Sequence, residues 1–481
     1  MAKLKNIIKQ LSSNDFEAIY HSLLENGADK SAYLLKSMRE RQTSDNKIMA
    51  ELEVNTNAYY TLRSRLNQKI EEYLLQQLES PRTDLLKKVA NINEIIFTKK
   101  KAIAIATLKK LEKELLDYDL SNELTIVYKS LKKLHINHPD HYNYSQLYNQ
   151  HVAYMLAVDK AEDLLGEYFK KYGQFTLSGN ETEKLELTLL NKEMNNVGAL
   201  YKSHRLYVYQ SCMNIFHRLF VEDEEESNYE EDLEPIEDIL NNIQKTFDSY
   251  HLDSIYHHLK IVFEFLKLEY YNHYRVYRKA EKYFEEVNED TGLLLSNYNL
   301  YTYPSQFLIT KLERHNRLGM EHEMFEENEG LFHDYETDVN DIPQYVTYMI
   351  YRAMCCYYSK NYDQAARWIN NLLNEVSLKK YPVTQLEIKV VLALQYCLLN
   401  DYDLFNQLIN SIQRQIRIIG KENVDHLTVF TKILKISISE LKKNKREKIR
   451  SLVDRFRSLD KKGFCPTKYI KLDDEFVGKL S

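Results

Sequence analysis

Residues 343–373 read PQYVTYMIYRAMCCYYSKNYDQAARWINNLL, and this stretch decides the fold. It opens on a proline, which the first turn of a helix tolerates because the missing N–H would have no partner there. Apolar residues then recur at helical spacing until the pair Lys360-Asn361, and the pattern resumes at Tyr362. We therefore predict two helices, over about 344–359 and 362–373, joined by a short turn.

The same arrangement recurs along the chain. Pro304, Pro343 and Pro382 are each 39 residues apart. The unit that opens at Pro382 repeats the pattern, with a first helix that contains 388–399, a turn at Asn400-Asp401 and a new helix from Tyr402. Regular spacing of such units is typical of a solenoid, in which each helical hairpin packs only on its neighbours.

The residues around each turn also follow a pattern. A small residue and a tyrosine lie late in the first helix, and an aromatic residue and a small residue follow the turn. The residues are Ala353, Tyr357, Tyr362, Ala365 and Ile369, then Ala393, Tyr396, Tyr402, Phe405 and Ile409, with an earlier copy around Ala280. This pattern resembles the tetratricopeptide repeat family, most clearly over residues 260–432.

The resemblance implies an all-α fold: a right-handed superhelix, or solenoid, of antiparallel helical hairpins, preceded by an N-terminal helical module. The period of 39 to 43 residues is longer than the family's period of about 34 residues, and it also suits HEAT-like units. The turn glycine of the family is replaced by Lys360 or Asn400. We divide the chain into four parts. Residues 1–80 are the N-terminal module and residues 81–259 a helical region with an acidic loop. Residues 260–440 are the repeats, and residues 441–481 a basic capping helix with its tail.

The composition agrees with this fold class and limits where in the cell the protein is expected. Glycine and proline number only 11 and 7 in 481 residues, which disfavours the many tight turns of sandwiches and barrels. The start has no apolar signal region, and no run of 18 apolar residues predicts a membrane span. The five cysteines include no C-x-x-C pair and predict no disulfide framework. We expect a cytoplasmic protein that does not enter the membrane.

Charge is distributed unevenly along the chain. Residues 1–110 carry a net charge of +6 and residues 432–481 a net charge of +8, so residues 111–431 carry −20. We expect the acidic run 222–234 to be a solvated loop. The alternative is that it acts as a decoy by occupying a basic surface. The 38 tyrosines are either amphipathic filler between helices or an aromatic binding groove.

These features predict a non-catalytic scaffold that binds a protein or peptide through a Tyr-rich, acidic surface. Because this surface is acidic, we expect a basic partner. No metalloprotease, nucleophile-elbow or phosphate-loop motif is present, and we expect no enzyme activity, cofactor or small-molecule substrate. We expect no metal site either, because Pro139 interrupts the series His135, His138 and His141. A structural subunit of a larger assembly is a further alternative.

Residues 45–70 support a different function, because they resemble a helix-turn-helix. Ile48, Leu52, Tyr59, Leu62 and Leu66 would face the core, with Val54 in the turn and Asn55 or Thr56 capping the second helix. The outward positions at helical spacing are then Asn57, Tyr60, Thr61 and Ser64, flanked by Arg63 and Arg65, and these six are the candidate nucleic-acid-binding residues. A polar front flanked by cations is what a recognition helix needs, so the alternative function is a nucleic-acid-associated regulator that also uses the basic C-terminal helix. The other interpretations are a plain helical hairpin for 45–70 and a capping helix for the basic C-terminal stretch.

Overall fold

The computed structural model describes most of the chain in a series of ranges. They are residues 4, 7, 8, 11, 13–40, 45–77, 81–118, 120–201, 203–222, 234–250, 254–296, 301–332, 338–438, 444–459 and 463–481. Throughout these ranges the regular structure is helical and there is no strand, so the all-α prediction is confirmed. Residues 223–233 of the predicted acidic loop lie outside the described residues, as do Lys442 and Lys443 at the start of the basic stretch.

The chain divides into two compact units, Met1–His151 and Val152–Ser481. The finer division at 80, 259 and 440 stays a prediction.

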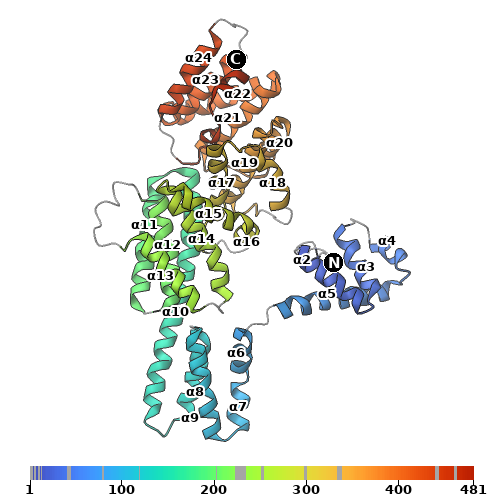
Figure 1. Ribbon diagram of the computed structural model, residues 1–481, viewed down its shortest axis with the longest axis vertical. Coiled ribbons are helices and arrows are strands. Elements are labelled where there is room, and N and C mark those ends of the chain that lie inside the picture. The colour runs from blue at the N-terminus through green and yellow to red at the C-terminus, as the bar shows by residue number, and fades with distance from the viewer. Residues whose placement is uncertain are drawn as a thin grey trace. The chain divides into compact units, whose positions relative to one another are not determined.

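The first unit contains two hydrophobic clusters. One is formed by α2 to α5 together with Leu4, Ile8 and Leu11, and the other by α6 to α9 with the start of α10. Helices α8 and α9 lie side by side in this second group (Figure 1). The helices are α2 (Ser13–Glu25), α3 (Asp29–Glu40), α4 (Asp45–Glu51), α5 (Thr56–Gln77), α6 (Pro81–Ala90), α7 (Ile92–Thr98), α8 (Lys101–Asp117), α9 (Ser121–Leu134) and the first part of α10 (Asp140–Ser178).

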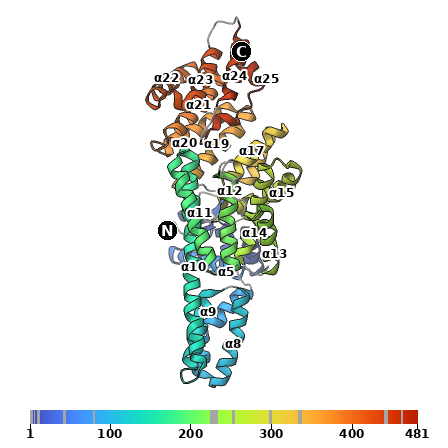
Figure 2. The ribbon, with the colours of Figure 1, turned by 90° about the vertical axis from the view of Figure 1, so that its left-hand side faces the viewer.

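The second unit is a succession of helices that pack in adjacent pairs. Its helices after α10 are α11 (Glu181–Leu200), α12 (His204–Phe220), α13 (Ile236–Ser249), α14 (Ser254–His273), α15 (Tyr277–Glu289), α16 (Thr291–Ser296), α17 (Gln306–Leu318), α18 (Glu323–Leu331), α19 (Ile342–Tyr358), α20 (Tyr362–Glu375), α21 (Pro382–Leu399), α22 (Tyr402–Ile419), η1 (Glu422–Val424), α23 (Asp425–Ile438), α24 (Lys445–Ser458), η2 (Pro466–Tyr469) and α25 (Asp474–Leu480). Helices α19 to α24 follow one another pair upon pair in both views (Figures 1 and 2).

The predicted hairpins are present. Helix α19 packs on α20, α20 on α21, and α21 on α22. Helix α17 also contacts α19, and α21 also contacts α23. Helices α19 and α21 are buried over most of their surface, because they lie in the interior of this array. Helices α20 and α22 bury one face only, as their helical spacing of apolar residues requires.

The turns explain why the chain reverses where it does. Lys360 ends α19 with φ 62° and Asn400 ends α21 with φ 59°, the left-handed conformation common at helix C-termini. The next residue caps the second helix: Asn361 accepts a hydrogen bond from the backbone N–H of Gln364, and Asp401 from that of Leu404. Two residues thus end one helix and start the next.

Helix α21 is the one described helix that is long and apolar enough, by length and composition, to cross a membrane. Of its apolar stretch, 61% is buried inside the fold, which is typical of a core helix.

Candidate functional site

The helix-turn-helix-like segment of the first unit comprises α4, a turn and α5. Ile48, Leu52, Tyr59 and Leu66 are buried, as predicted, and Leu62 is partly buried against the same cluster. Glu53, in the turn between α4 and α5, has a φ of 52°, in the left-handed region that glycine adopts most easily. Asn55 is the cap of α5, because its side-chain oxygen accepts from the backbone N–H of Ala58 at 2.9 Å.

Five of the six predicted nucleic-acid-binding side chains are exposed on α5: Asn57, Tyr60, Thr61, Ser64 and Arg65. The sixth, Arg63, is half-buried, and its guanidinium lies 5.8 Å from the centre of the Tyr59 ring. The structure therefore presents the predicted polar front on one helix, whether or not it binds nucleic acid.

The basic C-terminal stretch forms α24, which packs on α23 through Ile449, Val453 and Phe456. Its cations are not all free for a polyanion. Arg450 forms an ion pair with Asp474, and Arg457 donates to the backbone oxygen of Leu472 at 2.6 Å. The helix thus packs on α23 and holds the following residues in place.

Most tyrosines of the paired helices fill the space between neighbouring helices. Tyr345, Tyr351, Tyr357 and Tyr358 are buried between helices, as the filler interpretation requires. A more accessible aromatic group remains around α14 and α15, where Tyr274 and Tyr277 are exposed and Tyr270, Tyr271 and Tyr283 are half-buried.

The chain after α24 returns across the array as an irregular segment that we name the C-terminal strap, residues 463–473. The strap is held largely through its backbone. The oxygen of Tyr469 accepts hydrogen bonds from the Asn316 side chain, at 2.9 Å, and from the Tyr358 hydroxyl, while that hydroxyl accepts from the N–H of Lys471 at 3.1 Å. Side chains of α17 and α19 therefore bind the strap through its backbone N–H and carbonyl groups.

Two lysines of the strap pair with acidic side chains of the array. Lys468 lies 3.5 Å from Glu313 of α17, and Lys471 pairs with Glu321 in the turn between α17 and α18. Between them, Tyr469 and Ile470 are buried. The array thus binds a basic, irregular segment of its own chain by backbone hydrogen bonds, apolar side chains and lysine–carboxylate pairs.

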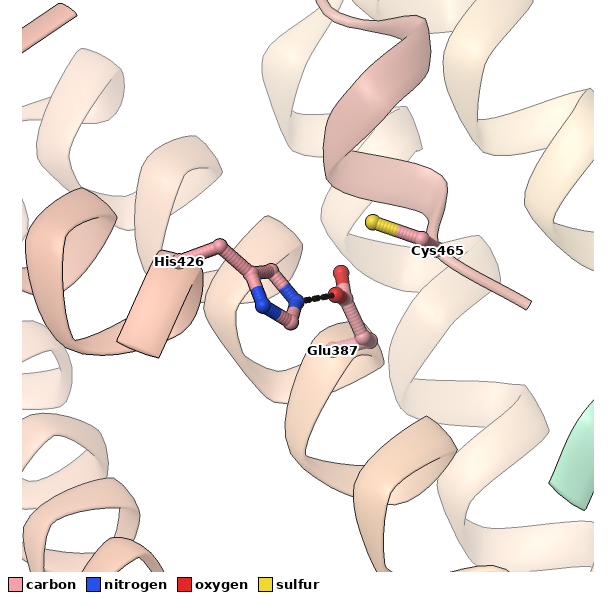
Figure 3. Close-up of side chains that lie close together, drawn as sticks. All are labelled: Glu387, His426 and Cys465. Atoms are coloured by element: carbon pink, nitrogen blue, oxygen red, sulfur yellow. Dashed lines mark hydrogen bonds and ion pairs between the residues drawn. The ribbon is translucent and has the colours of Figure 1, made fainter. Parts of the chain in front are cut away.

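A cluster of three buried side chains lies where the strap meets the array. We name it the 387–426–465 cluster, after Glu387 of α21, His426 of α23 and Cys465 of the strap. Their exposed fractions are 1%, 5% and 1% (Figure 3). One ligating atom from each residue lies within 4.8 Å of the others. The three residues come from different parts of the chain and point toward one another.

Hydrogen bonds tie the cluster to the strap. Nε2 of His426 lies 2.6 Å from Oε1 of Glu387, and Oε2 of Glu387 accepts from the hydroxyl of Thr467 at 2.8 Å and from its N–H at 3.3 Å. The sulfur of Cys465 is 3.3 Å from the same hydroxyl. Burial, followed by the charge of Glu387, raises the pKa of the Cys465 thiol, so the thiol is protonated in the protein alone.

A second buried carboxyl group, Glu269 of α14, lines a cavity of about 280 Å³. It accepts a hydrogen bond from Thr310 of α17, and Arg314 and Arg317 line the same cavity. Those two arginines are already paired with Glu281 of α15. Burial, together with the nearby negative charge of Glu313 and against the hydrogen bond from Thr310, raises the pKa of Glu269 to about 8.

Sequence reasoning found the α5 front but missed the strap and the 387–426–465 cluster. A signal for the cluster was present, since Glu387, His426 and Cys465 are 39 residues apart, the interval that also separates the three prolines. Equivalent positions of neighbouring units lie side by side in a repeat array, so this interval brings distant residues together.

No known protein family, curated protein or solved structure matches the chain.

Proposed function

We propose that this chain is a non-catalytic protein-interaction scaffold, built as a tetratricopeptide-like right-handed superhelix, that binds extended basic segments of partner proteins. The observation that carries the proposal is the C-terminal strap. The array already binds a basic segment of its own chain, which contains the short helix η2, through the Tyr358 hydroxyl and through the carboxylates of Glu313 and Glu321.

The chemistry of the strap contacts defines what the partner should offer. Hydrogen bonds to a peptide backbone are independent of side-chain identity, so they favour any extended chain. The ion pairs select for lysine or arginine, and the net charge of −20 over residues 111–431 attracts such a partner from a distance. Specificity then depends on the apolar side chains between the cations, as with Tyr469 and Ile470 of the strap.

All five cysteines are free and buried in the structure. This suits a reducing compartment, and we place the scaffold in the cytoplasm.

The test is affinity capture with the tagged full chain at 50 and 500 mM salt. Captured proteins should carry accessible basic segments and should be largely lost at the higher salt, because surface ion pairs are screened there. A free peptide with the sequence of residues 464–473 should compete, whereas the same peptide with glutamate in place of Lys468 and Lys471 should not. Capture of no protein at either salt, or equal competition by both peptides, would count against the proposal.

The second candidate function is that of a nucleic-acid-associated regulator, and the observation that favours it is the exposed polar front of α5. A gel-shift with DNA and RNA should show binding that weakens steeply with salt. The Arg63→Ala/Arg65→Ala variant should bind more weakly than wild type, and Lys99→Ala/Lys100→Ala, outside α5, is the matched control. The absence of any shift at low salt would remove this candidate.

A further inference from the structure

We propose that the 387–426–465 cluster is a structural zinc site that joins the C-terminal strap to α21 and α23. The proposal goes beyond the scaffold function, because a zinc site here would act on the fold whether or not the array binds a partner. It also departs from the sequence-based expectation that the chain has no metal site.

The donor set selects for zinc among the common metal ions. A thiol sulfur, an imidazole nitrogen and carboxylate oxygens are the ligands that zinc combines in proteins, whereas magnesium and calcium take oxygen ligands alone. Cys465, His426 and Glu387 supply one of each kind. The second carboxylate oxygen of Glu387 is engaged by Thr467, so the three side chains supply three of the four ligands of a tetrahedral zinc ion.

The distances are compatible with one ion between the three side chains. Zinc–ligand bonds of roughly 2.0–2.3 Å place tetrahedral ligand atoms roughly 3–4 Å apart. The three ligating atoms already lie within 4.8 Å of one another, so small side-chain rotations would be enough. The 2.6 Å contact between His426 and Glu387 would lengthen as the ion takes the place of the proton between them.

Charge balance favours the metal-bound form in this buried site. The double positive charge of zinc is neutralised by one carboxylate and one thiolate, so no net charge is left in the interior. On binding, the thiol proton of Cys465 leaves to solvent, and the ring proton of His426 is carried on Nδ1, which frees Nε2 for the ion. The pKa of a coordinating thiol falls far enough for this deprotonation to occur.

Thr467 provides the outer support that such sites need. Its hydroxyl and backbone N–H both donate to Oε2 of Glu387, so they fix the orientation of the carboxylate. Because Thr467 and Cys465 are two residues apart in the strap, binding of the ion would hold the strap at the same point as these hydrogen bonds.

The experiment begins with the wild-type full chain, purified without chelators. Elemental analysis should find zinc in an amount equimolar with the chain. Replacement by cobalt(II) should give a sulfur-to-cobalt charge-transfer absorption, a readout that needs no variant. Removal of the metal with a chelator should lower the melting temperature, and added zinc should restore it.

The variants assign the metal to these residues. Cys465→Ser should abolish the charge-transfer absorption, while Cys397→Ser, at another buried cysteine of the same unit, should retain it. Thr467→Val should lower zinc affinity roughly 10–100-fold without removing a ligand. The proposal is overturned if wild type holds no zinc and neither zinc nor chelator shifts its melting temperature. It is equally overturned if Cys465→Ser keeps the absorption.

Discussion

At the residue scale, three turns of the second unit adopt the same backbone conformation without the glycine that would adopt it most easily. Arg275, Lys360 and Asn400 have φ values of 58°, 62° and 59°, and each precedes by two residues the tyrosine that opens the next helix. A side chain in the left-handed region costs roughly 1–2 kcal/mol relative to glycine. The packed helix pairs on either side compensate for that cost.

We therefore expect Lys360→Gly to be more stable than Lys360→Ala by about 1 kcal/mol, because only glycine relieves the strain. Both substitutions remove the exposed pair with Glu475, so that loss cancels in the comparison. Urea unfolding of the two variants measures the difference. Equal stability would mean that the turn is not strained.

Glu269 predicts a pH dependence of stability. Its carboxyl group has an ordinary pKa of 4.5 and a folded pKa of about 8, so folding retains a proton that the unfolded chain releases between these values. Stability should therefore fall as pH rises through this window, by up to roughly 4 kcal/mol.

The Glu269→Gln variant should lose this part of the pH dependence of the free energy of unfolding. Its amide oxygen still accepts the hydrogen bond from Thr310, but the glutamine side chain does not ionise. Denaturant unfolding at pH 5 and pH 8.5 measures the effect. Glu285→Gln, at an exposed carboxylate of α15, should keep the wild-type slope. If Glu269→Gln keeps it too, the carboxyl group is not buried in the way described.

At the element scale, small residues set the separation of the helices within a pair. Ala365 is fully buried where α20 packs on α19, and Ala280 is at the corresponding place of α15 against α14. Ala365→Leu should destabilise the fold by about 1–3 kcal/mol, because three added carbon atoms find no space in a close-packed contact. Thermal unfolding is the measurement.

Asn371→Leu introduces the same side chain on the exposed face of α20 and should change stability by less than about 0.5 kcal/mol. A similar loss in both variants would show that leucine disturbs α20 itself and not its packing on α19.

At the scale of the second unit, the strap connects elements far apart in sequence. Tyr358 and Lys471 are joined by one hydroxyl group across an interval of 113 residues. Tyr358→Phe leaves the backbone oxygen of Tyr469 and the N–H of Lys471 without this partner, at a cost of about 1–3 kcal/mol. We expect lower global stability and faster proteolysis within residues 463–473.

Tyr402→Phe is the matched control, because the Tyr402 hydroxyl is on an exposed side chain and bonds only Asn400 among the described residues. It should leave both readouts close to wild type. If the strap of Tyr358→Phe is cleaved at the wild-type rate, the Tyr358 hydroxyl does not hold the strap.

The sequence by itself determined the local structure of this protein. Helical periodicity, three prolines at one interval and the pairs Lys360-Asn361 and Asn400-Asp401 predicted the hairpin of α19 and α20 to within two residues, and the turn between α21 and α22, because these signals act between residues close in the chain. The apolar back and polar front of α5 were predicted for the same reason. Only the tertiary structure decided where the strap lies and that Glu387, His426 and Cys465 meet. Those contacts join residues that are far apart in sequence, and no local pattern of hydrophobicity or turn propensity reports which distant side chains the packing of successive helices will bring together.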